Sequence, residues 1–391
     1  MNAPSIDLDF YAMDAIRDPA ATYRRMLDAG PVVHLSPQGM HAICGFPELT
    51  TSLRDWRVFS SAEGVSMDDG VNAFLKGSTL NSDPPAHDAS RTITFKPLTP
   101  KALAAVKERV ETSAKAAVDA VLAKGTFDAA ADLAPRVPLD VVRDLVGLGP
   151  HGSEHMLSWG HATFELMGDA RERKPAALEG LAGLRTFLER EEVWDDLTAD
   201  GWAKAATDAG LAQGRSEDEA RKLMRDYIAP SLDTTISALG YGLWLFAHNP
   251  EQWTALREDP SRLRNAIEEV VRLTTPIRAF TRYTMEDTQV ADAELQAGER
   301  VLVVYGAANR DERRFPDPDR FDIDRDVRGH VGFGHGVHAC LGMHLARLEI
   351  TAVLSQLMER VVRFEPAGDP QVAQNATIFA LSSAPVRAVT A

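Results

Sequence analysis

The sequence predicts a single domain, residues 1–391, of mainly α class with small β-sheets (α+β). Its 391 residues are 45% hydrophobic and 25% charged, so the chain can bury one large core. No repeat of fixed period and no Ser/Gly-rich or Pro-rich linker divides it into independent units. Apolar residues spaced by three and four predict helices over four long segments, residues 100–123, 216–248, 260–274 and 341–361.

Strand signals are fewer and shorter than helix signals. Segments 32–46 and 300–307 and the stretch Thr377–Val389 each lie between turn-forming residues and predict strands. Between Ala307 and Gly332 the chain is rich in Asp, Arg and Pro and has no sustained period. This composition predicts a long ordered loop, and loops of this length tend to carry function.

The charge balance limits the kinds of partner that the chain can bind. The chain has 42 basic and 57 acidic side chains and a net charge of −15, which opposes binding to nucleic acid or to an anionic membrane surface. Residues 1–30 carry Asp and Arg throughout and lack the apolar run of a signal peptide or membrane anchor, so we expect a cytoplasmic protein. Only Cys44 and Cys340 occur, far apart, and a disulfide framework is not expected.

The strongest chemical signal is the segment Phe333-Gly-His-Gly-Val-His-Ala-Cys340-Leu-Gly342, which directly precedes a predicted helix. Glycines permit tight turns and a close approach of backbone to a flat ligand, and the start of a helix favours a thiolate over a thiol. Cys340 is therefore a candidate metal ligand. The alternatives are an ordinary buried thiol and a zinc site shared with nearby histidines, although one cysteine among three glycines does not repeat a zinc pattern. These histidines are His335, His338 and His344.

This segment resembles the heme-binding loop of cytochromes P450, F-G-x-G-x-H-x-C-x-G, at every fixed position. The resemblance implies the triangular-prism fold of that family, with a long distal helix over heme b. It implies that Cys340 is the ligand of the heme iron, that Phe333 and Gly334 lie against the heme, and that His338 reaches a propionate. An axial thiolate favours O–O cleavage, so the resemblance also implies oxygen activation.

A second match lies in the stretch Asp83-Pro-Pro-Ala-His87-Asp-Ala-Ser-Arg91, which resembles the family's D-P-P-x-H-x-x-x-R segment. There the histidine and arginine contact heme propionates, and the planar guanidinium suits a carboxylate. Family members often carry another arginine two positions after the histidine, where this chain has Ala89. The resemblance thus assigns propionate binding to His87, Arg91, Arg282 and His338.

A third match involves Glu269 and Arg272, three residues apart on a predicted helix, and Arg320 in the following loop. Alone, such a pair would be read as a solvated surface contact. Together with the loop it resembles the family's Glu-Arg-Arg structural triad. We expect this triad to tie the helix to the loop behind the heme.

The stretch from Ala229 to Thr235 resembles the family's distal helix motif A-G-x-D-T-T. The resemblance makes Asp233 and Thr234 the catalytic acid–alcohol pair that delivers protons. The chain departs from the motif at Pro230 and Ser231, and proline predicts a kink because it removes an N–H and clashes with the carbonyl four residues earlier. The alternative is a polar interruption of a buried helix, with threonine bonded to a carbonyl one turn earlier.

The resemblance also locates the substrate pocket, and most residues there are apolar, which suits a small hydrophobic or aromatic substrate. Several segments are most similar to bacterial members that oxidise para-substituted aromatic acids. However, Glu63 and Asp226 would repel a substrate carboxylate unless neutralised, so a neutral aromatic or terpenoid substrate is an alternative. The expected contacts are Val65, Phe164, Met167, Ile277, Phe280 and Ile378.

Together these matches predict a monooxygenase that inserts one oxygen atom from O2 by hydroxylation or O-dealkylation. Electrons would come from a ferredoxin and its reductase. A peroxide-driven peroxygenase and a non-catalytic heme-thiolate sensor are the rivals, and the pair Asp233 and Thr234 argues against both. The positive residues expected to steer an acidic partner to the face near Cys340 are Lys96, Arg313, Arg314 and Arg347.

Overall fold

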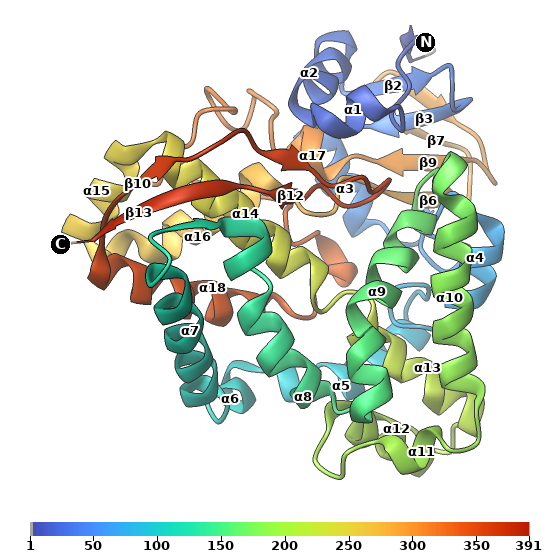
Figure 1. The fold of residues 1–391 in the computed structure, drawn as a ribbon. Helices are drawn as coiled ribbons and strands as arrows, with labels where there is room; N and C mark the ends of the chain where they lie inside the picture. The colour runs from blue at the N-terminus through green and yellow to red at the C-terminus, as the bar shows by residue number, and fades with distance from the viewer. Residues whose placement is uncertain (1–2, 391) are drawn as a thin grey trace.

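The computed structural model describes residues 3–390, and helices make up most of it (Figure 1). The helices are α1 (Met13–Arg17), α2 (Pro19–Ala29), α3 (Phe46–Arg54), α4 (Asp69–Leu75), α5 (Ala86–Thr94), α6 (Pro100–Leu103), α7 (Lys107–Leu122), α8 (Arg143–Val146), α9 (Gly149–Met167), α10 (Lys174–Glu189), α11 (Val193–Asp196), α12 (Trp202–Ala212), α13 (Glu217–Ile228), α14 (Asp233–His248), α15 (Pro250–Glu258), α16 (Leu263–Thr274), α17 (Tyr305–Ala308) and α18 (Met343–Arg360).

The strands form small sheets beside this helical body. A six-stranded sheet has the order β1-β2-β3-β9-β6-β4, and a three-stranded sheet has the order β10-β13-β5. Two further pairs are β11–β12 and β7–β8. The strands are β1 (Ser5–Ile6), β2 (Val32–Leu35), β3 (Met40–Ile43), β4 (Phe59–Ser60), β5 (Thr126–Asp128), β6 (Phe280–Thr284), β7 (Thr288–Val290), β8 (Ala293–Leu295), β9 (Arg300–Val303), β10 (Val361–Pro366), β11 (Gln371–Val372), β12 (Leu381–Ser383) and β13 (Pro385–Thr390).

The strand predictions hold with two corrections. The strand predicted over residues 300–307 ends at Val303, because the chain then turns into α17. Gly306 explains the change, since a Cβ at this position would collide with the ring of Tyr23 on α2, and only glycine allows the two helices to approach. The strand predicted over Thr377–Val389 begins only with β12.

Two predicted helices are interrupted. Segment 100–123 divides into α6 and α7, separated by a turn at residues 104–106. Segment 216–248 is not one long helix either, because α13 ends at Ile228 and α14 begins at Asp233. Pro230 lies in the gap and has no N–H to continue the helical bonds. The Ser231 hydroxyl donates to the carbonyl of Tyr227 instead, and so closes the end of α13.

The main apolar core lies around α14. Gly242 allows a close approach here, because a Cβ at this residue would lie 2.9 Å from Val270 Cγ1 on α16. Helices α7 and α18 pack side by side and contribute residues to the same core, together with β10. This packing fixes α14 and α18 relative to each other and determines the spacing of the segments that form the candidate site.

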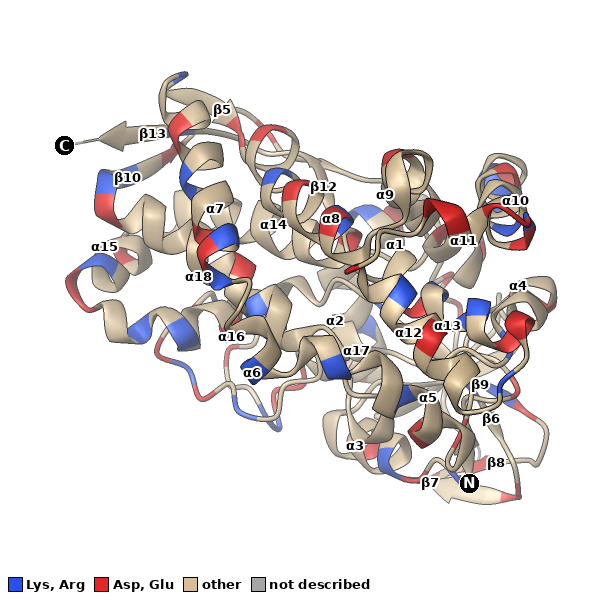
Figure 2. Ribbon diagram, turned by 90° about the horizontal axis from the view of Figure 1, so that it is seen from below, with Lys and Arg blue, Asp and Glu red and all other residues tan. Residues whose placement is uncertain are grey.

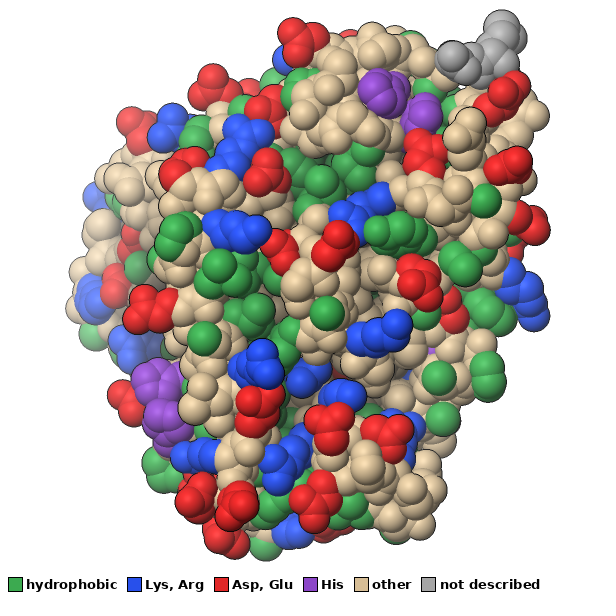
Figure 3. All heavy atoms as spheres, turned by 90° about the vertical axis from the view of Figure 1, so that its right-hand side faces the viewer, with side chains coloured by type: hydrophobic (Ala, Val, Ile, Leu, Met, Phe, Trp, Pro, Cys, Tyr) green, Lys and Arg blue, Asp and Glu red, His purple; other side chains and the backbone are tan. Residues whose placement is uncertain are grey.

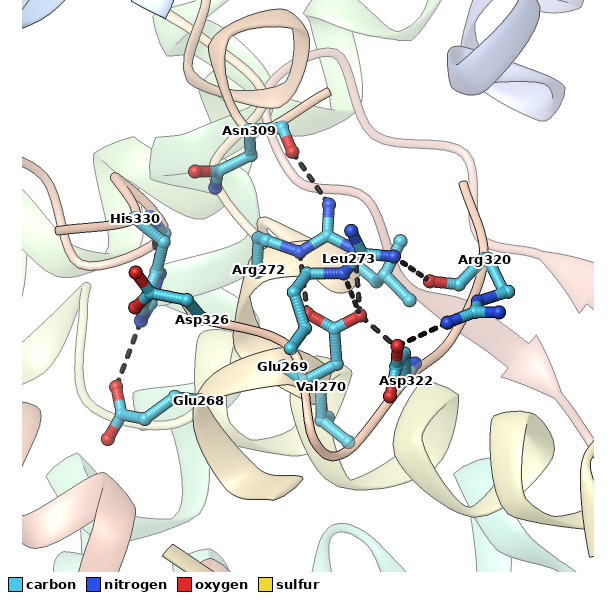
Figure 4. Close-up of polar contacts among 12 residues, drawn as sticks. Glu268, Glu269, Val270, Arg272, Leu273, Asn309, Arg320, Asp322, Asp326 and His330 are labelled. Atoms are coloured by element: carbon cyan, nitrogen blue, oxygen red, sulfur yellow. Dashed lines mark hydrogen bonds and ion pairs between the residues drawn. The ribbon is translucent and has the colours of Figure 1, made fainter. Parts of the chain in front are cut away.

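A buried polar cluster ties α16 to the loop that follows α17 (Figure 4). Glu269 and Arg272 have side chains that are 0% exposed, and Arg272 Nε and Nη2 donate to the two carboxylate oxygens over 2.6 and 2.8 Å. Arg325 Nε donates to Glu269 Oε1 over 3.1 Å. The N–H of Asp322 donates to the same oxygen over 3.2 Å. The carboxylate is thereby saturated with donors from the helix and from the loop.

The prediction that Arg320 completes this triad is wrong. Its side chain is 66% exposed and pairs with Asp322, and Arg325 takes the position against Glu269 instead. The reason lies in the neighbouring Phe321, whose ring is buried in the core and therefore leaves Arg320 facing solvent. Arg325 returns to the cluster and also donates to the carbonyls of Asp317 and Arg320.

The surface carries charges of both signs. Figure 3 shows them interspersed on the face formed by α4 and α10, with apolar side chains visible between them. Within residues 3–390, no helix combines the length and the apolar character needed to cross a bilayer.

Arg325→Gln is expected to lower the free energy of unfolding by about 3 kcal/mol, because it removes one donor from a buried carboxylate. Arg320→Gln is the matched control and should leave stability unchanged, since its ion pair lies in solvent. Denaturant unfolding of both variants measures the difference. Equal losses in the two variants would contradict the assignment of Arg325 to the cluster.

Candidate functional site

A cavity of about 260 Å³ lies between α14, α18 and the segment that contains Cys340. Its walls are mainly apolar, and they bring together residues from parts of the chain that are far apart in sequence. The predicted site residues that line it are Arg91, Phe164, Met167, Thr234, Ile277, Phe280, Arg282, Phe333, Gly334, His338 and Cys340.

The Cys340 segment is held in a tight loop by its own backbone. The N–H of Cys340 donates to the carbonyl of Phe333 over 2.7 Å, and Gly334 and Gly336 adopt φ values of +70° and +69°. A Cβ at Gly336 would collide with the carbonyl oxygen of Leu53, so this position requires glycine for space as well as conformation. The loop ends directly before α18, which begins at Met343.

The environment of the Cys340 thiol raises its pKa overall, although several groups act against this. Burial raises the pKa, while the N–H groups of Gly342 and Met343 and the positive charges of Arg91 and Arg347 act to lower it. The donors at the start of α18 and the two cations are features that stabilise a thiolate. A bound cation at the sulfur would add to them and favour the deprotonated form.

Arg347 also positions the Phe333 ring of this loop. Its guanidinium carbon lies 4.6 Å from the ring centroid of Phe333, and it donates to both carboxylate oxygens of Glu268. His330 contacts Glu268 over 2.9 Å. Although burial raises the pKa of Glu268, these hydrogen bonds bring it down to about 2, so the carboxylate remains charged. The Phe333 ring is thus positioned from α16 and α18 together.

Two histidines face each other at the edge of the cavity with unused ring nitrogens. The rings of His87 and His338 lie 4.6 Å apart, and the Nε2 atom of each is buried without a hydrogen-bond partner at 3.5 Å or less among the described residues. The nearest acceptor to His338 Nε2 is Asp83 Oδ1, at 3.9 Å. Burial lowers the pKa of His338 to about 4. The buried Arg282 and the partly buried Arg91 line the cavity as well, whereas His87 is not among the lining residues and contacts the cavity only through the ring of His338.

These residues fit heme. The mostly apolar cavity suits a flat macrocycle, and the free Nε2 atoms of His87 and His338 are donors that two carboxylates could fill. Arg91 donates to the carbonyl of Ala339 and Arg282 to that of Thr281, which leaves further N–H groups on each guanidinium. The Cys340 sulfur supplies the single thiolate that such a group needs as axial ligand.

Asp233 and Thr234 are adjacent but differ in their surroundings. The Thr234 hydroxyl lines the cavity and donates to the carbonyl of Pro230 over 3.2 Å, one turn earlier. Asp233 is not among the lining residues, and its Oδ2 atom is buried without a hydrogen-bond partner in the part of the chain that the structure describes. Burial raises the pKa of Asp233 to about 7, so its carboxyl group can gain and lose a proton near neutral pH.

Two predicted substrate contacts are wrong as lining residues. Val65 and Ile378 are buried in an apolar cluster together with Phe164 and Met167, and they do not face the cavity. The backbone explains both positions. The carbonyl of Val65 accepts the N–H of Thr281, and Ile378 forms a β-bridge with Ile277, so both residues lie in a second layer behind the wall.

The sequence reasoning missed Glu349 on α18. This residue is 0% exposed and lines the cavity, and neither carboxylate oxygen has a hydrogen-bond partner among the residues described. Burial raises its pKa to about 8. A glutamate flanked by apolar residues in the stretch Leu348 to Ile350 was the available signal, since a carboxylate on the buried face of a helix is costly.

The zinc alternative has no ligand set. Across the described part of the chain, no three His, Cys, Asp or Glu side chains converge into a group that could hold a metal ion. His335 accepts from Arg54 Nε over 2.8 Å, and His344 lies beside Phe95, so the two do not converge with Cys340.

Comparison with known proteins agrees with this geometry. The family model described as "Cytochrome P450" matches residues 202–388. The protein "Cytochrome p450 CYP199A2" of Rhodopseudomonas palustris is 35% identical, over 98% of this chain and 94% of its own. The "6-deoxyerythronolide B hydroxylase" of Saccharopolyspora erythraea is 29% identical over 91% of each. The solved structure of "Cytochrome P450 CYP109Q5" from Chondromyces apiculatus superposes with a TM-score of 0.80 at 29% identity, covering 100% of this chain and 99% of that one.

Glu349→Gln is expected to raise the melting temperature at about pH 9 and to leave it unchanged at about pH 5. The folded-state pKa of about 8 exceeds the ordinary 4.5, so folding keeps a proton that the unfolded chain loses, and stability falls as pH rises between these values. Glu359→Gln, an exposed position on the same helix, is the matched control. A pH-independent effect of Glu349→Gln would contradict this reasoning.

Proposed function

The chain belongs to the cytochrome P450 family of heme b monooxygenases, and from this premise we propose that it inserts one oxygen atom from O2 into a small hydrophobic, aromatic substrate. The observation that carries the proposal is the shared cavity, in which the Cys340 thiol and the Thr234 hydroxyl are lining residues from separate elements. The apolar wall residues between them provide space for a substrate.

Cys340 would hold the heme iron, and His87, Arg91, Arg282 and His338 would hold the propionates. The unpartnered nitrogens of the two histidines support this assignment. Phe333 and Gly334 would lie against the macrocycle on the Cys340 side, where the tight loop permits close approach. When bound, the heme supplies the activation of dioxygen, chemistry that side chains alone cannot perform.

Thr234 and Asp233 would control protons at the opposite wall. The Thr234 hydroxyl can both accept and donate a proton at the cavity surface, and it is positioned by the carbonyl of Pro230. Asp233 has a pKa raised to about 7, so it can take up a proton and release it to its neighbour at neutral pH. The break between α13 and α14 leaves these two residues at the start of α14.

The substrate would be held mainly by shape. Phe164, Met167, Ile277 and Phe280 line the cavity with two aromatic rings and two aliphatic side chains, which suit an aromatic ring better than a polar chain. Hydroxylation and O-dealkylation are both compatible with such a wall, since either reaction places a C–H bond near the site of oxygen activation.

Electrons would come from a ferredoxin and its reductase, docking on the face near Cys340. Of the four cations predicted there, Arg313, Arg314 and Arg347 are engaged in ion pairs within the chain, so their charges are compensated. Lys96 is exposed and has no acidic partner among the described ion pairs. Lys101 on α6 and Arg54 on α3 share this property and support docking of an acidic partner. Figure 2, in which Lys and Arg are blue, shows where these two helices lie.

The reduced, carbon monoxide-bound protein is expected to show a Soret band near ~450 nm, the signature of thiolate ligation. Cys340→Ser should abolish this band, and Cys44→Ser, the other cysteine, should retain it. A difference spectrum of each variant measures this. A band retained by Cys340→Ser would refute the ligand assignment.

Thr234→Ala is expected to keep the heme spectrum but to lower product formed per reducing equivalent by about tenfold, with hydrogen peroxide released instead. The reason is the loss of the cavity hydroxyl that passes protons. Thr234→Ser retains the hydroxyl and should restore coupling. Product and peroxide yields at equal reductant consumption measure this, and unchanged coupling in Thr234→Ala would remove the residue from the relay.

A further inference from the structure

One end of the cavity is polar, although neither heme binding nor proton delivery uses it. This end is formed where α13 meets the segment that follows α4. Its polar lining residues are Ser78, Thr79, Arg225 and Asp226. The remaining walls are mainly apolar, with Thr163, Ser231, Thr235 and Glu349 as their other polar residues outside the proposed heme and proton sites, so the four neighbouring polar side chains at this end can give a bound substrate a fixed orientation.

Arg225 is a partly buried cation with unused donors. Its guanidinium carbon lies 4.0 Å from the ring centroid of Phe74, and its Nη1 donates to the carbonyl of the same residue. The Nε atom is buried away from the cavity and has no hydrogen-bond partner among residues 3–390, so the donors open to a ligand are the remaining N–H groups of the guanidinium. No carboxylate of the described residues forms an ion pair with this side chain. Burial lowers the pKa of Arg225 to about 10, so it is still charged at neutral pH.

Asp226 presents acceptors beside this donor. Its carboxylate accepts the N–H of Thr79 over 3.2 Å and also the Thr79 hydroxyl, which leaves lone pairs free on both oxygens. Pro230, four residues later, has no N–H to donate to the Asp226 carbonyl. Burial raises the pKa of Asp226 to about 6, so the group is mostly ionised at neutral pH.

The charges that act on Asp226 come from three elements. Arg225 lies on α13 itself, Arg215 precedes α13, and Arg91 lies on α5. None of the three forms an ion pair with Asp226 at 4.0 Å or less among the described residues. The cavity lining therefore contains one negative and one positive group from the same helix, not paired with each other, and each has unused hydrogen-bonding capacity.

We propose that Arg225 and Asp226 form a polar subsite that selects substrates with a neutral group able to donate and accept a hydrogen bond, such as a phenol or a primary amide, over substrates with a carboxylate. A phenol can donate to Asp226 and accept from Arg225. A carboxylate can use only the Arg225 donor, and it meets the negative charge of Asp226 at close range in a poorly hydrated site. The inference rests on the proposed function, because it takes this cavity as the substrate pocket.

The test compares three probes that share a para-ethylphenyl group and differ in the polar substituent: para-ethylphenol, para-ethylanisole and para-ethylbenzoate. Their binding to the heme-loaded protein is measured by isothermal titration calorimetry at neutral pH. The phenol is expected to bind about tenfold tighter than the benzoate and tighter than the anisole, which accepts but does not donate. Asp226→Asn keeps the shape and removes the charge. This variant should reduce the ratio of the phenol affinity to the benzoate affinity to about threefold or less, mainly because the benzoate binds more tightly.

Glu63→Gln is the matched control, because it also removes one negative charge from a segment predicted to border the pocket. Glu63 is exposed and does not line the cavity, so the ratio should stay at the wild-type value. Asp226→Ser provides a second charge-removing variant if Asp226→Asn does not fold. Equal binding of phenol and benzoate by the wild type, or an unchanged ratio in a folded Asp226 variant, overturns the subsite.

The reduced carbon monoxide spectrum separates this result from the proposed function. A missing thiolate band with the binding ratio intact would overturn the monooxygenase assignment and leave the subsite standing as a binding site. A normal band with no preference among the probes would overturn the subsite alone.

Discussion

Burying a carboxylate is costly unless donors surround it, and Glu269 meets this condition with Arg272, Arg325 and the N–H of Asp322. The same cluster extends to the Cys340 loop. Arg272 donates to the carbonyl of Asn309, whose side chain accepts the N–H of Val331 over 2.8 Å at the start of that loop. The position of the thiol therefore depends on charges that are distant from it in sequence, and this is why a long loop with little regular structure can hold a site.

Much of the fold followed from periodicity and turn residues. Helices over 263–274 and 343–360 and the strands at 32–35 and 40–43 lie where apolar spacing and turn formers place them. The failures are caused by contacts between segments that are distant in sequence. A strand-like pattern around Tyr305 gives way to helix because Gly306 and its neighbours are small enough to pack on α2, and that contact is not visible in a local window.

The predictions for the candidate site likewise divide into residues that the structure places as expected and residues that it places elsewhere. Motif spacing predicted residues that the structure brings together, since Cys340, Thr234 and most of the predicted contacts line one cavity. It did not distinguish Arg320 from Arg325, since both arginines lie in one loop and only the burial of Phe321 decides which side chain turns inward. Val65 and Ile378 were misplaced by one layer for a related reason, as the sequence shows that a residue is apolar but not which side of a wall it occupies.

The break at Pro230 separates two pairs of residues that a continuous helix would connect rigidly. Arg225 and Asp226 lie on the piece that ends at Ile228, while Asp233 and Thr234 lie on the piece that starts after the gap. A change in the first piece can alter its tilt without transmitting the shift through helical hydrogen bonds, because those bonds are absent between them. A change on α13 can thus reshape one wall of the cavity while Asp233 and Thr234 keep their register on α14, which makes the α13 segment the natural place to begin redesigning the proposed selectivity.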